Sequence, residues 1–104
     1  MRAGYSVLRE IDKKNFIPEG NDYGLSEREF ENFIFFLENK GFLERVLRVN
    51  DFFSIKPARL TLKGKELLEE LHHYEASYPA DRSELKKWVE IEKKAYSNGA
   101  FEDY

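Results

Sequence analysis

The strongest constraint on the fold is a helix start close to the end of the first quarter of the chain. Ser26 and Glu29 have the spacing of a capping box, in which each side chain accepts a hydrogen bond from the other residue's backbone amide. An apolar residue on each side of the box completes a hydrophobic staple: Leu25 and Phe30. Four residues share the spacing of one apolar helical face: Phe30, Phe33, Ile34 and Leu37. The pattern predicts a helix over 26–39, closed by Gly41 in the left-handed conformation.

Other segments have the periodicity or the end signals of helices. The expected elements are a helix from Gly4 to Asn15, a short turn over Asn21–Gly24, a helix from Thr61 to about Tyr74 and a last helix from Asp81 to Asn98. Pro18 ends the first helix because it pushes the residue before it out of the helical region. Thr61 and Asp81 are capping residues at the starts of the last two helices. We expect residues 100–104 to fray.

The segment after Gly41 has the composition of β-structure. Phe42 to Val49 and Phe52 to Ile55 predict two antiparallel strands joined by a turn at Asn50-Asp51. Ala58 to Leu60 either extends the second strand or adds a short one. Pro57 cannot donate a ladder hydrogen bond, so it marks a strand edge or a loop.

The order of the expected elements is helix, short turn, capped helix, β-ribbon, helix, helix. A three-helix core followed by a β-ribbon wing is the winged helix–turn–helix arrangement, so we expect an α+β fold of this kind with additional C-terminal helices. At 104 residues the chain fits one winged-helix domain over residues 1–104. The capped helix stands directly before the ribbon, which is the position of a recognition helix.

Five short motifs also carry a resemblance to a known family. They are Tyr5-Ser6-Val7-Leu8-Arg9-Glu10-Ile11, Asp22-Tyr23-Gly24-Leu25-Ser26, the stretch from Leu37 to Leu43, Leu60-Thr61-Leu62-Lys63-Gly64 and Lys86-Lys87-Trp88-Val89. In these motifs the chain resembles the YjcQ-like family of small winged-helix proteins from bacteria and their prophages. The resemblance covers nearly the whole chain. It implies the fold and DNA binding, and it implies no enzymatic activity.

The net charge of −3 hides an uneven distribution. Phe42 to Lys65 contains six bases and two acids, a net charge of +4, so the rest of the chain carries −7. Binding depends on the local potential within about 10 Å rather than on the whole-chain charge. We therefore expect the phosphates of double-stranded DNA to be contacted by the basic residues of this segment: Arg45, Arg48, Lys56, Arg59 and Lys63.

The capped helix also has residues that can read bases. At 100° per residue, the face opposite its core stripe holds four side chains: Arg28, Asn32, Phe35 and Asn39. Arginine can pair with guanine and asparagine with adenine. With Lys40 included the helix nevertheless carries −2, and Glu27 and Glu31 beside this face would repel phosphates. A base-reading face and an ordinary solvated face both remain open.

Two aromatic residues are candidates for a partner or dimer surface. Phe35 lies in an apolar run that surrounds its helix, so either the ribbon or the last helix covers it, or it binds a partner. Trp88 lies on the apolar face of the last helix, which packs either on the first helix or on a second copy of the chain. We favour the homodimer. Two functions follow: a DNA-binding, transcription-regulator-like protein, which we favour, and a protein-interaction module that does not bind DNA.

Other classes of function find no support in the sequence. The absence of cysteine excludes disulfides, thiolate catalysis and zinc fingers. There is no glycine-rich phosphate loop and no nucleophile elbow, so we expect no catalytic residue and no cofactor. His72 and His73 point about 100° apart on a helix, so we expect no metal site. No apolar stretch approaches the ~20 residues of a membrane span, and the start lacks a signal peptide, so we expect a cytoplasmic protein.

Overall fold

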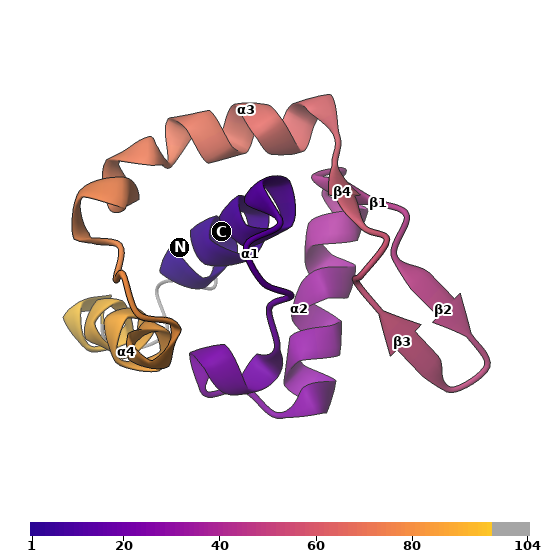
Figure 1. The fold of residues 1–104 in the computed structure, drawn as a ribbon, viewed down its shortest axis with the longest axis horizontal. Helices are drawn as coiled ribbons and strands as arrows, with labels where there is room; N and C mark the ends of the chain where they lie inside the picture. The colour runs from indigo at the N-terminus through magenta and orange to yellow at the C-terminus, as the bar shows by residue number, and fades with distance from the viewer. Residues whose placement is uncertain (97–104) are drawn as a thin grey trace.

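The computed structural model describes the backbone of residues 1–96 and the side chains of residues 1–92. It confirms the α+β class. In chain order, with η marking 3₁₀ helices, the elements are α1 (Arg2–Lys13), η1 (Gly20–Tyr23), α2 (Glu27–Asn39), β1 (Leu43–Glu44), β2 (Leu47–Val49), β3 (Phe52–Ser54), β4 (Arg59–Leu60), α3 (Leu62–Glu70), η2 (His72–Ser77), η3 (Arg82–Glu84) and α4 (Leu85–Tyr96) (Figure 1).

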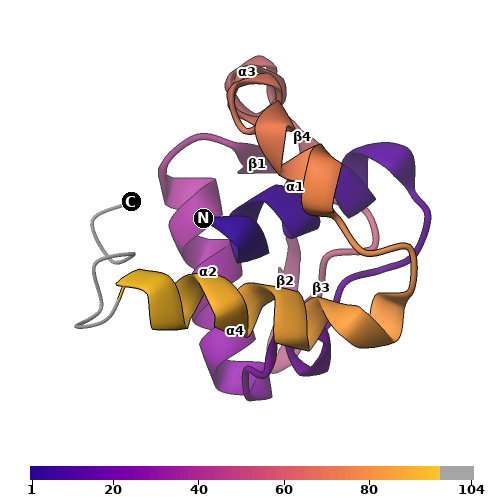
Figure 2. The ribbon, with the colours of Figure 1, turned by 90° about the vertical axis from the view of Figure 1, so that its left-hand side faces the viewer.

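Helix α1 lies at the centre of the fold, between α3 and α4 (Figures 1 and 2). Its predicted apolar stripe is buried: Tyr5, Val7, Leu8 and Ile11. The helix spans Arg2–Lys13 rather than the expected Gly4 to Asn15. The residue that follows it, Lys14, has a left-handed φ of +57° and stops the helix. The predicted start at Gly4 lies after the observed start at Arg2. No side chain caps the first turn, so the sequence holds no signal that marks where this helix begins.

Helix α2 begins where the capping box predicts. The Ser26 amide donates to Glu29 Oε1 at 2.8 Å, and the Glu29 amide donates to Ser26 Oγ at 3.1 Å. Two of the four amides that a helix start leaves unpaired are therefore satisfied. Gly41 has a φ of +85°, as its role after the helix end predicts. The short turn before α2 is the 3₁₀ helix η1, in which Glu19 and Asp22 form a second capping box.

The β-structure is more fragmented than expected. Strands β2 and β3 form a hairpin that projects from the body of the molecule, while β1 pairs with β4 in a separate short ladder. The predicted strand from Phe42 to Val49 is wrong as one element because Arg45, at a φ of +66°, interrupts it between β1 and β2. Of the two predictions for Ala58 to Leu60, the separate short strand is confirmed as β4.

The start of α3 is held against the end of α2. Thr61 accepts a hydrogen bond from the Gly64 amide at 3.0 Å, which confirms its capping role. A Cβ added to Gly64 would stand 2.1 Å from the carbonyl oxygen of Phe42, so only glycine allows this close approach. The helix ends at Glu70, earlier than predicted, and the chain continues to Ser77 as the 3₁₀ helix η2.

Helix α4 packs on its own chain, which corrects the prediction that Trp88 belongs to a partner or dimer surface. Trp88 is 6% exposed and lies edge-on to the rings of Tyr74 and Tyr78, with ring centroids 5.9 and 5.2 Å away. Its indole N–H donates to Ser77 Oγ at 3.0 Å. The aromatic residues that receive Trp88 follow α3, where the sequence predicts no packing partner. The expected helix end at Asn98 and the frayed tail over 100–104 lie outside the described residues.

Candidate nucleic-acid interface

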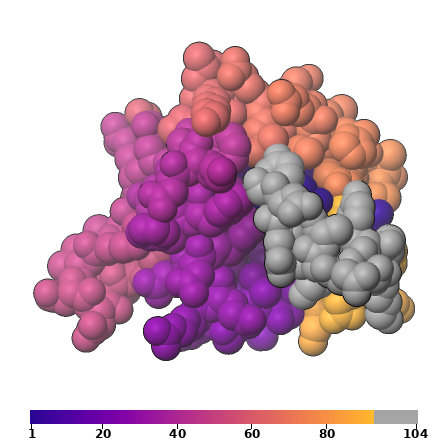
Figure 3. Space-filling model, turned by 180° about the vertical axis from the view of Figure 1, so that it is seen from behind, coloured from indigo at the N-terminus to yellow at the C-terminus, as the bar shows by residue number. Residues whose placement is uncertain are grey.

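Arg48 joins the β2–β3 hairpin to the outer face of α2. Its Nη1 lies 2.6 Å from Glu38 Oε1, and its guanidinium stands 5.4 Å from the ring centroid of Phe35 and 5.6 Å from that of Phe53. In the register of the hairpin, Arg48 pairs with Phe53, so both point to the side that faces α2. The hairpin and α2 therefore lie side by side, and Figure 3, seen from behind relative to Figure 1, shows their atoms next to one another.

The predicted outer face of α2 is exposed in the structure. Arg28, Asn32 and Asn39 are exposed and make no hydrogen bond or ion pair through their side chains with any described residue. The ring of Phe35 is 51% exposed, and the hairpin covers part of it through Arg48. The ribbon therefore contributes to covering Phe35, but it leaves half of the residue in contact with solvent.

The five basic residues predicted to contact phosphate differ in their availability. Arg45 and Lys56 are exposed and form no ion pair within the described part of the chain. Arg59 pairs with Glu44 across the β1–β4 ladder. Lys63 donates from Nζ to the backbone oxygen of Lys40 at 2.8 Å. The Arg48–Glu38 pair offsets part of the +4 charge of the segment because Glu38 lies outside it, whereas Glu44 is already included in that count.

An acidic cavity separates the N-terminal half of α2 from the hairpin. It has an open volume of about 390 Å³ and is lined by carboxyl groups and aromatic rings, among them Glu27, Glu31, Asp51, Phe52 and Phe53. Phe52 is 60% exposed. On the outward side of the hairpin, Leu47 and Val49 are also exposed. The sequence shows these acids and aromatic residues, but only the position of the hairpin brings them together.

A partly buried polar network crosses α1 and was not predicted. Glu75 accepts hydrogen bonds from Arg9 Nε at 2.8 Å, from Arg9 Nη2 at 3.0 Å and from the Tyr5 hydroxyl at 2.5 Å. These partners, Arg9 first, lower the pKa of Glu75 to about 2. Burial and the neighbouring carboxylate raise the pKa of Tyr5 to about 12. Burial, and then the hydrogen bond to Glu10, raise the pKa of Tyr78 well above its usual value. The network depends on η2 folding back over α1.

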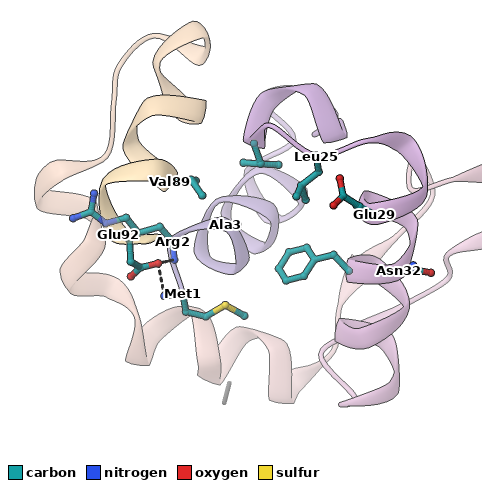
Figure 4. Close-up of a pocket in the computed structure, with 10 residues that line it drawn as sticks. Met1, Arg2, Ala3, Leu25, Glu29, Asn32, Val89 and Glu92 are labelled. Atoms are coloured by element: carbon teal, nitrogen blue, oxygen red, sulfur yellow. Dashed lines mark hydrogen bonds and ion pairs between the residues drawn. The ribbon is translucent and has the colours of Figure 1, made fainter. Parts of the chain in front are cut away.

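An apolar cavity of about 290 Å³ lies between α1, α2 and α4 (Figure 4). Glu92 stands at its rim and accepts hydrogen bonds from the Met1 ammonium at 2.6 Å and the Arg2 amide at 2.7 Å. Burial alone would raise the pKa of Glu92, but the hydrogen bonds from the ammonium and from Tyr74 lower it. Asn32 also lines this cavity, which sets it apart from the other three residues of the outer face of α2.

The described residues also bear on metal binding and on membrane insertion. Within residues 1–92, no group of three or more His, Asp or Glu side chains is arranged to hold a metal ion. His72 and His73 are exposed, and the ring of His73 packs on Tyr74 at 4.3 Å. None of the described helices is long and apolar enough to cross a membrane.

Comparison with known proteins gives a relative but no structural neighbour. No protein-family model matches the sequence, and no solved structure matches it. The uncharacterized protein YjcQ of Bacillus subtilis (strain 168) is 30% identical over 88 residues, which cover 82% of this chain and 92% of YjcQ. This similarity extends over nearly all of both proteins and confirms the resemblance found in the sequence. The chain belongs to the YjcQ-like family.

Proposed function

We propose that this protein is a winged-helix DNA-binding protein of bacterial or prophage origin that acts as a transcription regulator. In this proposal α1, η1 and α2 form the three-helix unit, α2 is the recognition helix and the β2–β3 hairpin is the wing. The observation that carries the proposal is the position of Arg48, which joins the hairpin to the outer face of α2. Helix and hairpin can thus contact one duplex together.

The ion pairs of the basic residues suggest which of them contact DNA phosphates most strongly. Arg45 and Lys56, which have no carboxylate partner among the described residues, contact phosphates directly. Arg59 must first exchange Glu44 for a phosphate, so it contributes less. Arg28, Asn32 and Asn39 are the exposed side chains on the outer face of α2 that can pair with base edges.

A salt-titrated binding assay on random-sequence duplex DNA tests the proposal. The double variant Arg45→Ala/Lys56→Ala should weaken binding on all sequences alike and reduce the salt slope by about two units, one for each lost phosphate contact. The double variant Lys86→Ala/Lys87→Ala removes the same charge from exposed positions of α4 and should bind like the intact protein. Absence of binding by the intact protein at low salt would refute the proposal.

The acidic cavity favours a second candidate function, a protein-interaction module that does not bind DNA. Its carboxyl groups and the exposed ring of Phe52 suit a basic peptide with aromatic residues. The double variant Glu27→Gln/Glu31→Gln separates the two candidates because it removes negative charge beside α2. DNA binding should become tighter if DNA is the ligand. Saturable binding of a labelled Lys- and Phe-rich peptide should become weaker if a protein is the ligand.

A further inference from the structure

A cavity of about 370 Å³ lies between the C-terminal end of α1 and the base of the hairpin. Its walls are mainly apolar and include Ile11, Phe16, Ile55 and Ala58. A smaller cavity of about 170 Å³ lies next to it and shares Phe16 in its lining. The larger volume falls within the range of small-molecule sites, which is roughly 300–1,000 Å³.

Glu10 lines both cavities and is the unusual residue of this region. Its side chain is 1% exposed. Its Oε2 accepts hydrogen bonds from Arg9 Nη1 at 2.7 Å and from the Tyr78 hydroxyl at 2.6 Å. Its Oε1 is buried and has no hydrogen-bond partner among the described residues. An unpartnered buried oxygen is costly and rare, which indicates that a donor is missing from this position.

The charges around Glu10 show which kind of donor fits. Arg9 is shared between two carboxylates, since it also forms two hydrogen bonds with Glu75. One guanidinium therefore serves two carboxyl groups, and Lys13 is a further cation near Glu75. A cationic donor would pair Oε1 through a charge-assisted hydrogen bond, which is stronger than the bond that a neutral donor makes.

We infer that the cavity binds a small organic primary ammonium ion, whose N–H groups donate to Glu10 Oε1 and whose carbon chain packs on the apolar walls. Because Oε1 is shielded from solvent, the ligand reaches it by displacing a side chain of the cavity wall. Lys14 and Lys56 also line the cavity and are exposed. An ω-amino carboxylate would place its carboxylate against these lysines, whereas a plain amine would leave them in solvent. The ammonium group is common to both ligands.

An NMR titration of the whole chain tests the inference without DNA, so its outcome is independent of the proposed function. The probes are n-butylammonium chloride and 5-aminopentanoate, with 1-butanol and sodium chloride as controls. Both ammonium probes should cause saturable shifts at the amides of Ile11, Ile55 and Ala58, and 1-butanol should not. If 5-aminopentanoate binds more tightly than n-butylammonium, the lysines bind the carboxylate and the ligand is an ω-amino carboxylate. If the two probes bind equally, the ligand is a plain amine.

Variants establish whether Glu10 is the group that binds. Glu10→Gln keeps the shape of the side chain but removes its charge, and it should weaken both probes about tenfold or more. Glu69→Gln makes the same exchange at an exposed position of α3 and should leave binding unchanged.

A second variant keeps the test valid if Glu10→Gln does not fold. Asn15 is exposed and lines both cavities, so Asn15→Phe should block the probes without loss of stability. Asn15→Ala should bind like the intact protein. The inference is wrong if neither ammonium probe gives a saturable shift, as expected of a site that holds only water. It is equally wrong if 1-butanol binds as well as n-butylammonium.

Discussion

Replacing Trp88 by alanine tests whether α4 is part of the fold of a single chain. The substitution empties a buried position, which costs about 3–5 kcal/mol for an aromatic residue of this size. This cost includes the indole hydrogen bond to Ser77 Oγ, worth about 1 kcal/mol, and the edge-on contacts with Tyr74 and Tyr78. Domains of this size are stable by only about 5–15 kcal/mol, so we expect a loss near 4 kcal/mol to be easily measured.

The assay is urea unfolding followed by far-UV circular dichroism, because the variant lacks the tryptophan that fluorescence would report. Trp88→Phe keeps an aromatic ring in the site and should lose only about 1–2 kcal/mol. Ile91→Ala, at a position of α4 that is 54% exposed, should change stability by about 0.5 kcal/mol or less. Sedimentation and unfolding at several protein concentrations separate packing within the chain from packing between chains. A midpoint that rises with protein concentration, or equal losses for Trp88→Ala and Ile91→Ala, would refute the reasoning.

Three further substitutions test local features. Ser26→Ala should lower the free energy of unfolding by about 1 kcal/mol because it removes the cap of α2, and a melting curve like that of the intact protein would contradict this. Gly64→Ala should destabilise the protein in thermal melts because the added Cβ collides with the backbone of Phe42; unchanged melting would show that α3 moves away freely. Glu75→Gln should remove a pH-dependent contribution to the free energy of unfolding. The folded-state pKa of Glu75, about 2, lies below its ordinary 4.5, so this stability is present above pH 4.5 and lost as the pH falls towards 2. We expect about 1–2 kcal/mol after allowance for the 37% exposure of the side chain, and parallel stability curves for the two proteins between pH 2 and 7 would contradict it.

The features that the sequence predicts best are those decided within a few residues. The capping box of Ser26 and Glu29 requires only the geometry of one helical turn, and the structure contains both of its hydrogen bonds. The cap at Thr61 and the positive φ of Gly41 are equally local. The buried stripe of α1 follows from its periodicity, whereas the start of this helix was misplaced because no side chain caps it.

The candidate site was predicted less completely because ion pairs depend on register. The exposure of Arg28 and Asn39 follows from counting around a helix, and the structure agrees. The pairing of Arg48 with Glu38 depends on how the hairpin lies against α2. The pairing of Arg59 with Glu44 depends on the separate β1–β4 ladder. The charge count already included Glu44, so it overestimated the positive charge of this segment only through the pairing of Arg48 with Glu38.

The sequence by itself determined the α+β class, the capped start of α2, the apolar stripe of α1 and membership of the YjcQ-like family, because these depend on local patterns and on residue identity. Only the tertiary structure decided which surface receives Trp88. It also decided that the carboxyl group of Glu10 is buried with one oxygen unpaired among the residues that the structure describes. Both depend on how the segment around Tyr78 folds: it lies 68 residues from Glu10, and it must turn back to meet Trp88. The same side-chain pattern is compatible with several such packings, and the burial of apolar surface selects among them only once the whole chain is folded.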